Sequence, residues 1–126
     1  MYRHNGWVGA ALTEIVVDAA DPGRLAGFWE QVLGWERTDE DETGVEISPP
    51  GGGRPKLVFV PVPEAKAGKN RIHIDVNPTG CDQDDELARL RSLGATDVDV
   101  GQGDQTWYVL ADPEGNEFCL LRTRVD

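Results

Sequence analysis

Two residues near the C-terminus have side chains that could take part in chemistry. In the sequence "NEFCLL", Glu117 and Cys119 are two positions apart, so an extended chain places both on one face. Phe118 and Leu120 then occupy the opposite face. This pattern fits a strand at the edge of a sheet in water, or a strand that directs two potential ligands into a cavity. The other predicted elements bear on this choice.

Two further predicted strands show the same alternation. In "TEIVVD", Glu14 lies on the face of Asp18, opposite Ile15 and Val17. In "RIHIDV", His73 and Asp75 share a face with Arg71, opposite an apolar set. We expect the apolar sets to pack under helices, and they are Ile15, Val17, Ile72, Ile74, Val76, Phe118 and Leu120. The polar faces would then line a concave cleft.

The polar residues of this cleft allow two readings. His73 and Glu117 could act as an acid–base pair on a small oxygenated substrate, with Glu14 as the alternative base. Alternatively, Glu14, Asp75 and their neighbours could satisfy one another in a hydrogen-bonded network that lines a binding pocket. A histidine in a strand is itself either a ligand or a structural hydrogen-bonding residue. The sequence leaves these alternatives open.

Two segments have the spacing of amphipathic helices. In the first, Asp21 is a suitable N-cap, Pro22 fits the first helical position and Gly34 fits the C-cap. Its apolar stripe predicts packing on a sheet and consists of Leu25, Phe28, Trp29, Val32 and Leu33. The second segment, "DQDDELARLRSLGA", has acidic residues in its first turn and ends at Gly94.

The order of the predicted elements repeats. Each half reads strand, helix and three strands, and the two helix-ending glycines are 60 positions apart. The predicted fold is therefore α+β, with two tandem βαβββ modules that form curved mixed sheets around a cleft. We expect one domain over residues 1–126, with module one at about 10–62, a linker at about 61–70 and module two at about 71–122. Clefts of this kind are common small-molecule sites.

Composition narrows the choice of partner. The 126 residues carry a formal net charge of −11, which argues against nucleic acid or an anionic membrane. No apolar run is long enough to cross a bilayer, and the N-terminus lacks the pattern of a signal peptide. Both cysteines are expected to be reduced and the location cytoplasmic. Trp35 and Trp107 lie in predicted strands, where each could stack on a flat ligand or pack in the core.

The motifs resemble those of a known family. "DPGRLAGFWEQVLGW", "RIHIDV", "LRSLGAT" and "VLADPEGNEFCLL" look like the glyoxalase-like branch of the vicinal oxygen chelate superfamily, which includes glyoxalase I, extradiol dioxygenases and bleomycin-resistance proteins. The resemblance extends from Leu12 to Leu121. It implies two βαβββ modules, a homodimer and clefts between modules.

The resemblance also implies a ligand set for a divalent metal. The matching positions hold Glu14, His73 and Cys119, where a glutamate is expected in place of Cys119. A thiolate favours zinc, and Glu117 could substitute if the register shifts. The fourth carboxylate has no counterpart in "KLVFV". Two functions follow: a lyase, isomerase or dioxygenase-type enzyme, or a metal-free protein that binds or sequesters a small molecule such as a drug.

Overall fold

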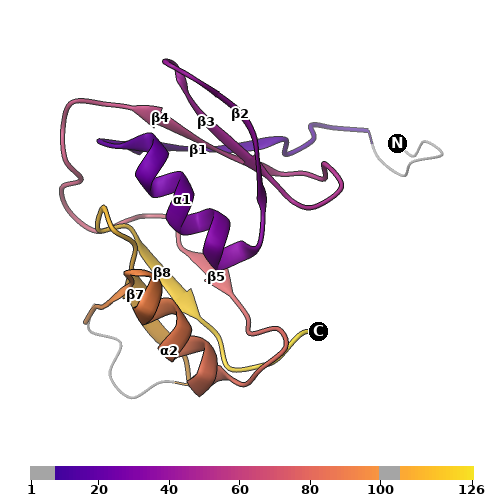
Figure 1. Ribbon diagram of the computed structural model, residues 1–126, viewed down its shortest axis with the longest axis vertical. Coiled ribbons are helices and arrows are strands. Elements are labelled where there is room, and N and C mark those ends of the chain that lie inside the picture. Colours follow the sequence, from indigo (N-terminus) through magenta and orange to yellow (C-terminus); the bar gives the residue numbers. More distant parts are fainter. Residues whose placement is uncertain (1–7, 100–105) are drawn as a thin grey trace.

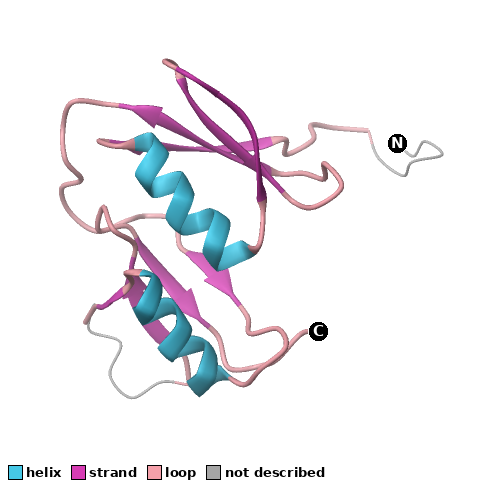
Figure 2. Ribbon diagram, in the orientation of Figure 1, coloured by secondary structure: helices cyan, strands magenta, loops and turns pink. Residues whose placement is uncertain are grey.

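The fold consists of two sheets, each accompanied by one helix (Figures 1 and 2). The computed structural model describes residues 8–99 and 106–126. Module one contains β1 (Glu14–Ala19), α1 (Pro22–Leu33), β2 (Glu36–Asp41), β3 (Gly44–Ser48) and β4 (Lys56–Pro61). Module two contains β5 (Ile74–Val76), α2 (Gln83–Leu93), β6 (Thr96–Asp97), β7 (Tyr108–Ala111) and β8 (Glu117–Leu120). The predicted α+β class with two βαβββ modules is confirmed.

The two modules have the same topology. The strand order is β1-β4-β3-β2 in the first sheet and β5-β8-β7-β6 in the second. In each sheet the first and last strands of the module pair in parallel, and the other pairs are antiparallel. The sequence repeat therefore corresponds to a structural repeat. It also leaves β1 and β5 as edge strands of their sheets.

Both helices begin and end at the predicted residues. The side chain of Asp21 accepts a hydrogen bond from the Arg24 amide at 3.2 Å, and Asp82 accepts one from the Asp85 amide at 2.9 Å. Gly34 ends α1 with a φ of 68°, in the left-handed region that glycine adopts without steric cost. These caps fix the residues at which each helix begins and ends, and so the points at which the chain enters the helix and leaves it for the next strand.

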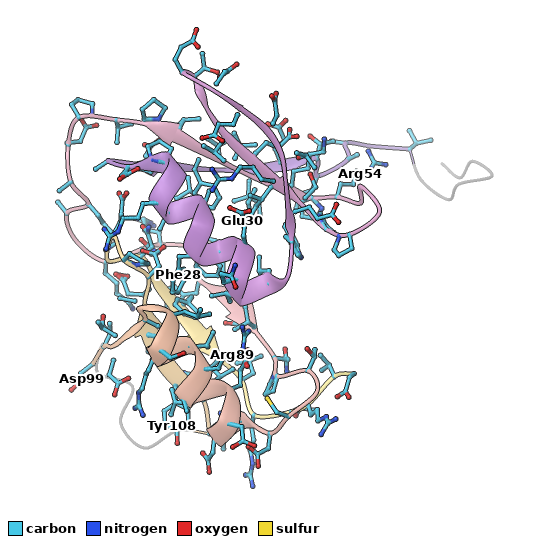
Figure 3. All side chains as sticks on the ribbon, in the orientation of Figure 1. Phe28, Glu30, Arg54, Arg89, Asp99 and Tyr108 are labelled. Carbon is cyan, nitrogen blue, oxygen red and sulfur yellow. The ribbon has the colours of Figure 1, made fainter. Side chains whose placement is uncertain are left out.

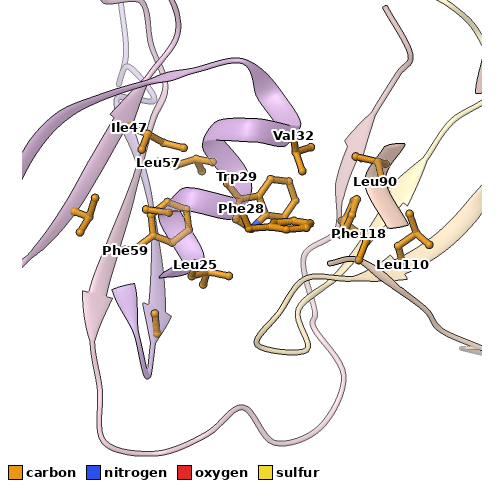
Figure 4. Packing of buried hydrophobic residues seen from close by; sticks show 14 of the residues in the cluster. Leu25, Phe28, Trp29, Val32, Ile47, Leu57, Phe59, Leu90, Leu110 and Phe118 are labelled. Atoms are coloured by element: carbon orange, nitrogen blue, oxygen red, sulfur yellow. The ribbon is translucent and has the colours of Figure 1, made fainter. Parts of the chain in front are cut away.

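A single hydrophobic core connects the two modules. Phe28 and Trp29 of α1 lie between the first sheet and Phe118 of the second sheet (Figure 4). The ring centroid of Phe118 is 6.1 Å from that of Phe28 and 4.9 Å from that of Trp29, in edge-to-face geometry. Such aromatic pairs contribute about 0.5–1.5 kcal/mol each beyond the burial of area. Helix α1 therefore holds the two modules together.

Polar contacts also join the two helices. Arg89 of α2, labelled in Figure 3, lies close to α1. It donates to the carbonyl oxygens of Gln31 and Val32 at the end of α1, both at 3.0 Å. Glu86 accepts from the same guanidinium at 2.7 and 2.8 Å, which fixes the direction of the Arg89 side chain. Within residues 8–99 and 106–126, no helix is long and apolar enough to cross a bilayer.

Several predicted strands are shorter in the structure. Strand β5 begins only at Ile74, whose pairing with Phe118 is the first of the β5–β8 register. His73 consequently precedes the strand, and Ile72 is 80% exposed instead of packing under a helix. Ile15, near the start of β1, is also exposed, whereas Val17 on the same face packs against the core. Phe118 and Leu120 are buried as predicted. The sequence also predicts a strand over Asp97–Val100; β6 covers Thr96–Asp97, and Val100 lies outside the described residues.

Candidate functional site

A cavity of about 430 Å³ lies between the two modules. Four segments contribute most of its lining residues: β1, the linker after β4, the start of module two and the turn before β8. Its apolar walls include Ile15, Val17, Trp29, Val62, Ile72 and Ile74. The apolar residues predicted to pack under the helices thus form much of this cavity instead. Its size and mixed lining are typical of a small-molecule site.

A second hollow, of about 590 Å³, lies between α1 and the end of α2. Its charged side chains are Arg24 and Asp112, and Phe28 contributes an aromatic surface. None of the residues predicted to act in catalysis or ligand binding lines this hollow. The cavity between the modules therefore offers the better candidate, because it contains Glu117 and a larger set of ionisable groups.

Glu117 and Lys66 form the ion pair of this cavity. Lys66 Nζ lies 2.7 Å from Glu117 Oε1, and the amide of Asn70 donates to Glu117 Oε2 at 2.9 Å. Burial of Glu117, which is only 7% exposed, raises its pKa, but the ammonium of Lys66 and the Asn70 amide outweigh this effect. The pKa of Glu117 is therefore lowered on balance. The Glu117 carboxylate is therefore ionised near neutral pH and accepts hydrogen bonds from both partners.

The turn that precedes β8 ties the cavity to α1. Glu114 accepts hydrogen bonds from the amides of Ala20 at 2.7 Å and Asp21 at 2.8 Å, at the start of the helix. A carboxylate at this end is favoured by the helix dipole. Asp112 accepts from the indole Nε1 of Trp29 at 3.0 Å. These contacts between modules hold the turn, and with it the start of β8, against α1.

The remaining predicted polar residues lie apart from the cavity. Glu14 is exposed on β1, where its backbone is opposite that of Lys56 in the adjacent strand. His73 is exposed and absent from the cavity lining, whereas its neighbours Ile72 and Ile74 contribute to it. The proposed acid–base pair of His73 with Glu117 is therefore not brought together in this cavity.

The donor set implied by the resemblance does not fit a metal within one chain. Among residues 8–99 and 106–126, no three His, Cys, Asp or Glu side chains gather in a manner that could hold a metal ion. Cys119 pairs with Asp75 across β8 and β5. Burial, followed by the nearby carboxylate of Asp75 and its hydrogen bond to the thiol, raises the pKa of Cys119. Glu14 lies in the other sheet, so the described residues do not bring Glu14 and Cys119 together in one set of ligands.

The aromatic and cationic residues at the cavity differ from those expected. Trp35 packs partly buried against the core, and Trp107 is exposed just before β7. Neither lines the cavity, whereas Trp29 does. The helical stripe had indicated a core role for Trp29, and its side chain has both roles. Lys66 was missed because it lies in a linker with no periodic pattern.

Comparison with known proteins identifies the family. The sequence model of the glyoxalase-like domain matches residues 14–121. The chain belongs to the glyoxalase-like domain family. This family lies in the vicinal oxygen chelate superfamily, as the resemblance had indicated. No curated protein matches the sequence.

Solved structures of the superfamily share the fold. A glyoxalase/bleomycin resistance protein/dioxygenase family enzyme from Burkholderia phytofirmans PsJN is similar with a TM-score of 0.69 and 18% identity, over 88% of this chain and 97% of that one. A possible glyoxalase from Bacillus cereus has a TM-score of 0.66 and 14% identity, over 90% and 99%. A mutant of the fosfomycin resistance protein FosX from Listeria monocytogenes, complexed with manganese(II) and 1S,2S-dihydroxypropylphosphonic acid, has a TM-score of 0.64 and 12% identity, over 91% and 90%. At these identities the likeness shows the fold alone.

Proposed function

We propose that this glyoxalase-like protein binds a small organic molecule in the cavity between its modules, without a metal. The observation that carries the proposal is the cavity of about 430 Å³, which combines aliphatic walls with the Lys66–Glu117 ion pair. Apolar walls supply affinity and a few placed polar groups supply orientation in sites of this kind. The drug-sequestering or ligand-sensing alternative from the sequence is therefore the preferred function.

The hypothesis that the protein is an enzyme receives less support from the geometry of the cavity. A lyase, isomerase or dioxygenase-type reaction at this cavity would need an acid–base pair or a set of metal ligands. Of the residues predicted for these roles, Glu117 alone lines the cavity, and its carboxylate is already bound by Lys66 and Asn70. We therefore assign Glu117 to ligand recognition.

A thermal-shift screen tests the proposal. Compounds with an apolar body and one polar group are expected to raise the melting temperature, because they bind only the folded protein. In an Ala65→Trp variant the added indole would occupy the cavity that Ala65 lines, and the hits should be lost. Ala88→Trp, at an exposed position on α2, is the matched control that keeps them. Hits that survive Ala65→Trp would contradict the proposal.

We also propose that two copies of the chain associate as a homodimer. Both sheets end in an edge strand, and edge strands present unpaired backbone groups. Val16 on β1 and Ile72 before β5 add exposed apolar side chains, at 55% and 80%. Light scattering after size exclusion should give twice the mass of the chain. A Val16→Lys variant should then shift the mass toward the monomer.

A further inference from the structure

Lys66 occupies one end of the cavity as a tethered alkylamine. Its side chain is only 19% exposed, and its ammonium group donates to Glu117 Oε1 and to the carbonyl oxygen of Gly68. The side chain therefore presents a short aliphatic stem and a primary ammonium group to acceptors that are already in place. A free amine of similar shape would meet the same acceptors.

The acceptor side of this pair is held independently of Lys66. The Asn70 amide binds Glu117 Oε2 at 2.9 Å, and Asn70 Nδ2 binds the backbone oxygen of Glu117 at 3.3 Å. The backbone of Glu117 is also paired with Ala111 in the β7–β8 ladder. A buried carboxylate that is fixed in this way requires a cation, because an unpaired buried charge is strongly unfavourable.

The tether that carries Lys66 has few other attachments. Residues 62–73 form neither helix nor strand. The Val62 amide binds the Ala19 carbonyl at 2.9 Å at the start of this segment, and Asn70 binds Glu117 further along. Between these two points, the Lys66 side chain bridges the segment to module two through its ion pair with Glu117. Exchange of its ammonium for another cation therefore leaves both ends of the segment attached.

The charges around the cavity favour such a cation. Its lining contains the carboxylates Asp18, Glu64, Asp112, Glu114 and Glu117, and one ammonium, that of Lys66. An anionic ligand would face this excess of negative charge, and the single ammonium is already paired with Glu117. An ammonium ligand would instead replace one cation with another and keep Glu117 neutralised.

We propose that Glu117 is the recognition group for a primary ammonium group on the cavity ligand, and that Lys66 is a built-in occupant which this ligand displaces. The ligand class is a primary amine with an apolar tail. The tail would contact the aliphatic wall formed by residues such as Ile15, Val17 and Ile74. This inference rests on the proposed small-molecule binding and names its ligand class.

Chemical rescue tests the recognition group directly. Lys66→Ala removes the atoms of a propylammonium group, leaves Glu117 unpaired, and should lower the melting temperature by roughly 10–20 °C. Added n-propylammonium should restore about 2 °C when its concentration equals its Kd, whereas 1-propanol should not. The rescue should be absent in Lys66→Ala/Glu117→Gln and in the exposed control Lys69→Ala. Equal shifts with amine and alcohol, or rescue without Glu117, would overturn the inference.

A second measurement uses the unaltered chain, so that it does not depend on the folding of a variant. Titrations compare 4-phenylbutylammonium, 4-phenyl-1-butanol and 4-phenylbutyrate. The amine should bind at least about tenfold more tightly than the alcohol, because its ammonium group forms a charge-assisted hydrogen bond with Glu117. The carboxylate should bind most weakly, because it meets the carboxylates that line the cavity. Equal affinities that Ala65→Trp abolishes would refute the amine inference and leave small-molecule binding intact. Failure of all three compounds, with no other hit in the screen, would overturn both proposals.

Discussion

The indole Nε1 of Trp29 in module one donates a hydrogen bond to Asp112 Oδ2 in module two, at 3.0 Å. Both residues are buried, and both line the cavity between the modules. Asp112 also accepts bonds from the amides of Glu114 and Asn116 at 2.9 and 3.0 Å, which hold the turn before β8. One carboxylate therefore joins the first helix to the turn that positions Glu117.

Loss of this indole contact should weaken the junction between the modules. Trp29→Phe keeps an aromatic ring in the core but removes one of the two hydrogen bonds that Asp112 Oδ2 accepts, the other coming from Asn116 Nδ2 at 3.0 Å. We expect a loss of about 1–3 kcal/mol in the free energy of unfolding, measured by urea denaturation. Trp107→Phe, at an exposed position, is the control and should change stability by less than about 0.5 kcal/mol. Equal losses in the two variants would contradict the role of the Trp29–Asp112 bond.

Removal of divalent metals should leave the protein unchanged. Glu14, His73 and Cys119 do not converge in the described part of one chain, so a metal has no shared set of ligands there. Dialysis against EDTA is expected to leave the melting temperature unchanged. Elemental analysis should give well under one metal ion per chain before and after His73→Ala. A stoichiometric metal that is lost in His73→Ala would contradict this expectation and favour a site shared between copies.

The two cysteines should differ in reactivity. Burial raises the pKa of both thiols, so the difference comes from access: Cys119 is only 7% exposed, whereas Cys81 is partly exposed. Alkylation by iodoacetamide, followed by mass spectrometry, should label Cys81 well before Cys119 in the folded protein. Asp75→Asn should accelerate the labelling of Cys119, since it removes one cause of the raised pKa. Asp84→Asn, on α2, serves as the control. Unchanged labelling of Cys119 in Asp75→Asn would contradict this account.

Local chemistry was sufficient to predict the helices and the module repeat. Asp21, Pro22 and Gly34 act within a few residues of the chain, and their roles follow from backbone geometry alone. Phe118 and Leu120 were predicted correctly because strand alternation places them on one face, and that face packs in the core with residues such as Phe28 and Leu90.

The site was harder to predict, because it depends on how the modules meet. The alternation of "RIHIDV" placed His73 opposite Ile72 and Ile74, but the prediction assigned the polar face, and not the apolar one, to the cavity. The cavity wall then includes Ile72 and Ile74 rather than His73. Lys66 reaches Glu117 across 51 positions of sequence, and no periodicity in the linker indicates that contact.

The Glu117–Lys66 pair predicts how stability depends on pH. Although burial raises the pKa of Glu117, Lys66 and the Asn70 amide lower it below its value in the unfolded chain, which is about 4.3. As the pH falls, the unfolded state therefore binds this proton first, and acid favours unfolding. The contribution of ionised Glu117 to the free energy of unfolding is present above pH 4.3 and is lost as the pH falls through the folded-state pKa.

Urea denaturation should show Glu117→Gln less stable than the unaltered chain at pH 7, with a difference in unfolding free energy that shrinks below about pH 4.3. Glu42→Gln, exposed in the β2–β3 hairpin, is the matched control and should have little effect at either pH. A gap for Glu117→Gln that stays constant from pH 7 to pH 3.5 would show that the ionised carboxylate does not stabilise the fold through Lys66.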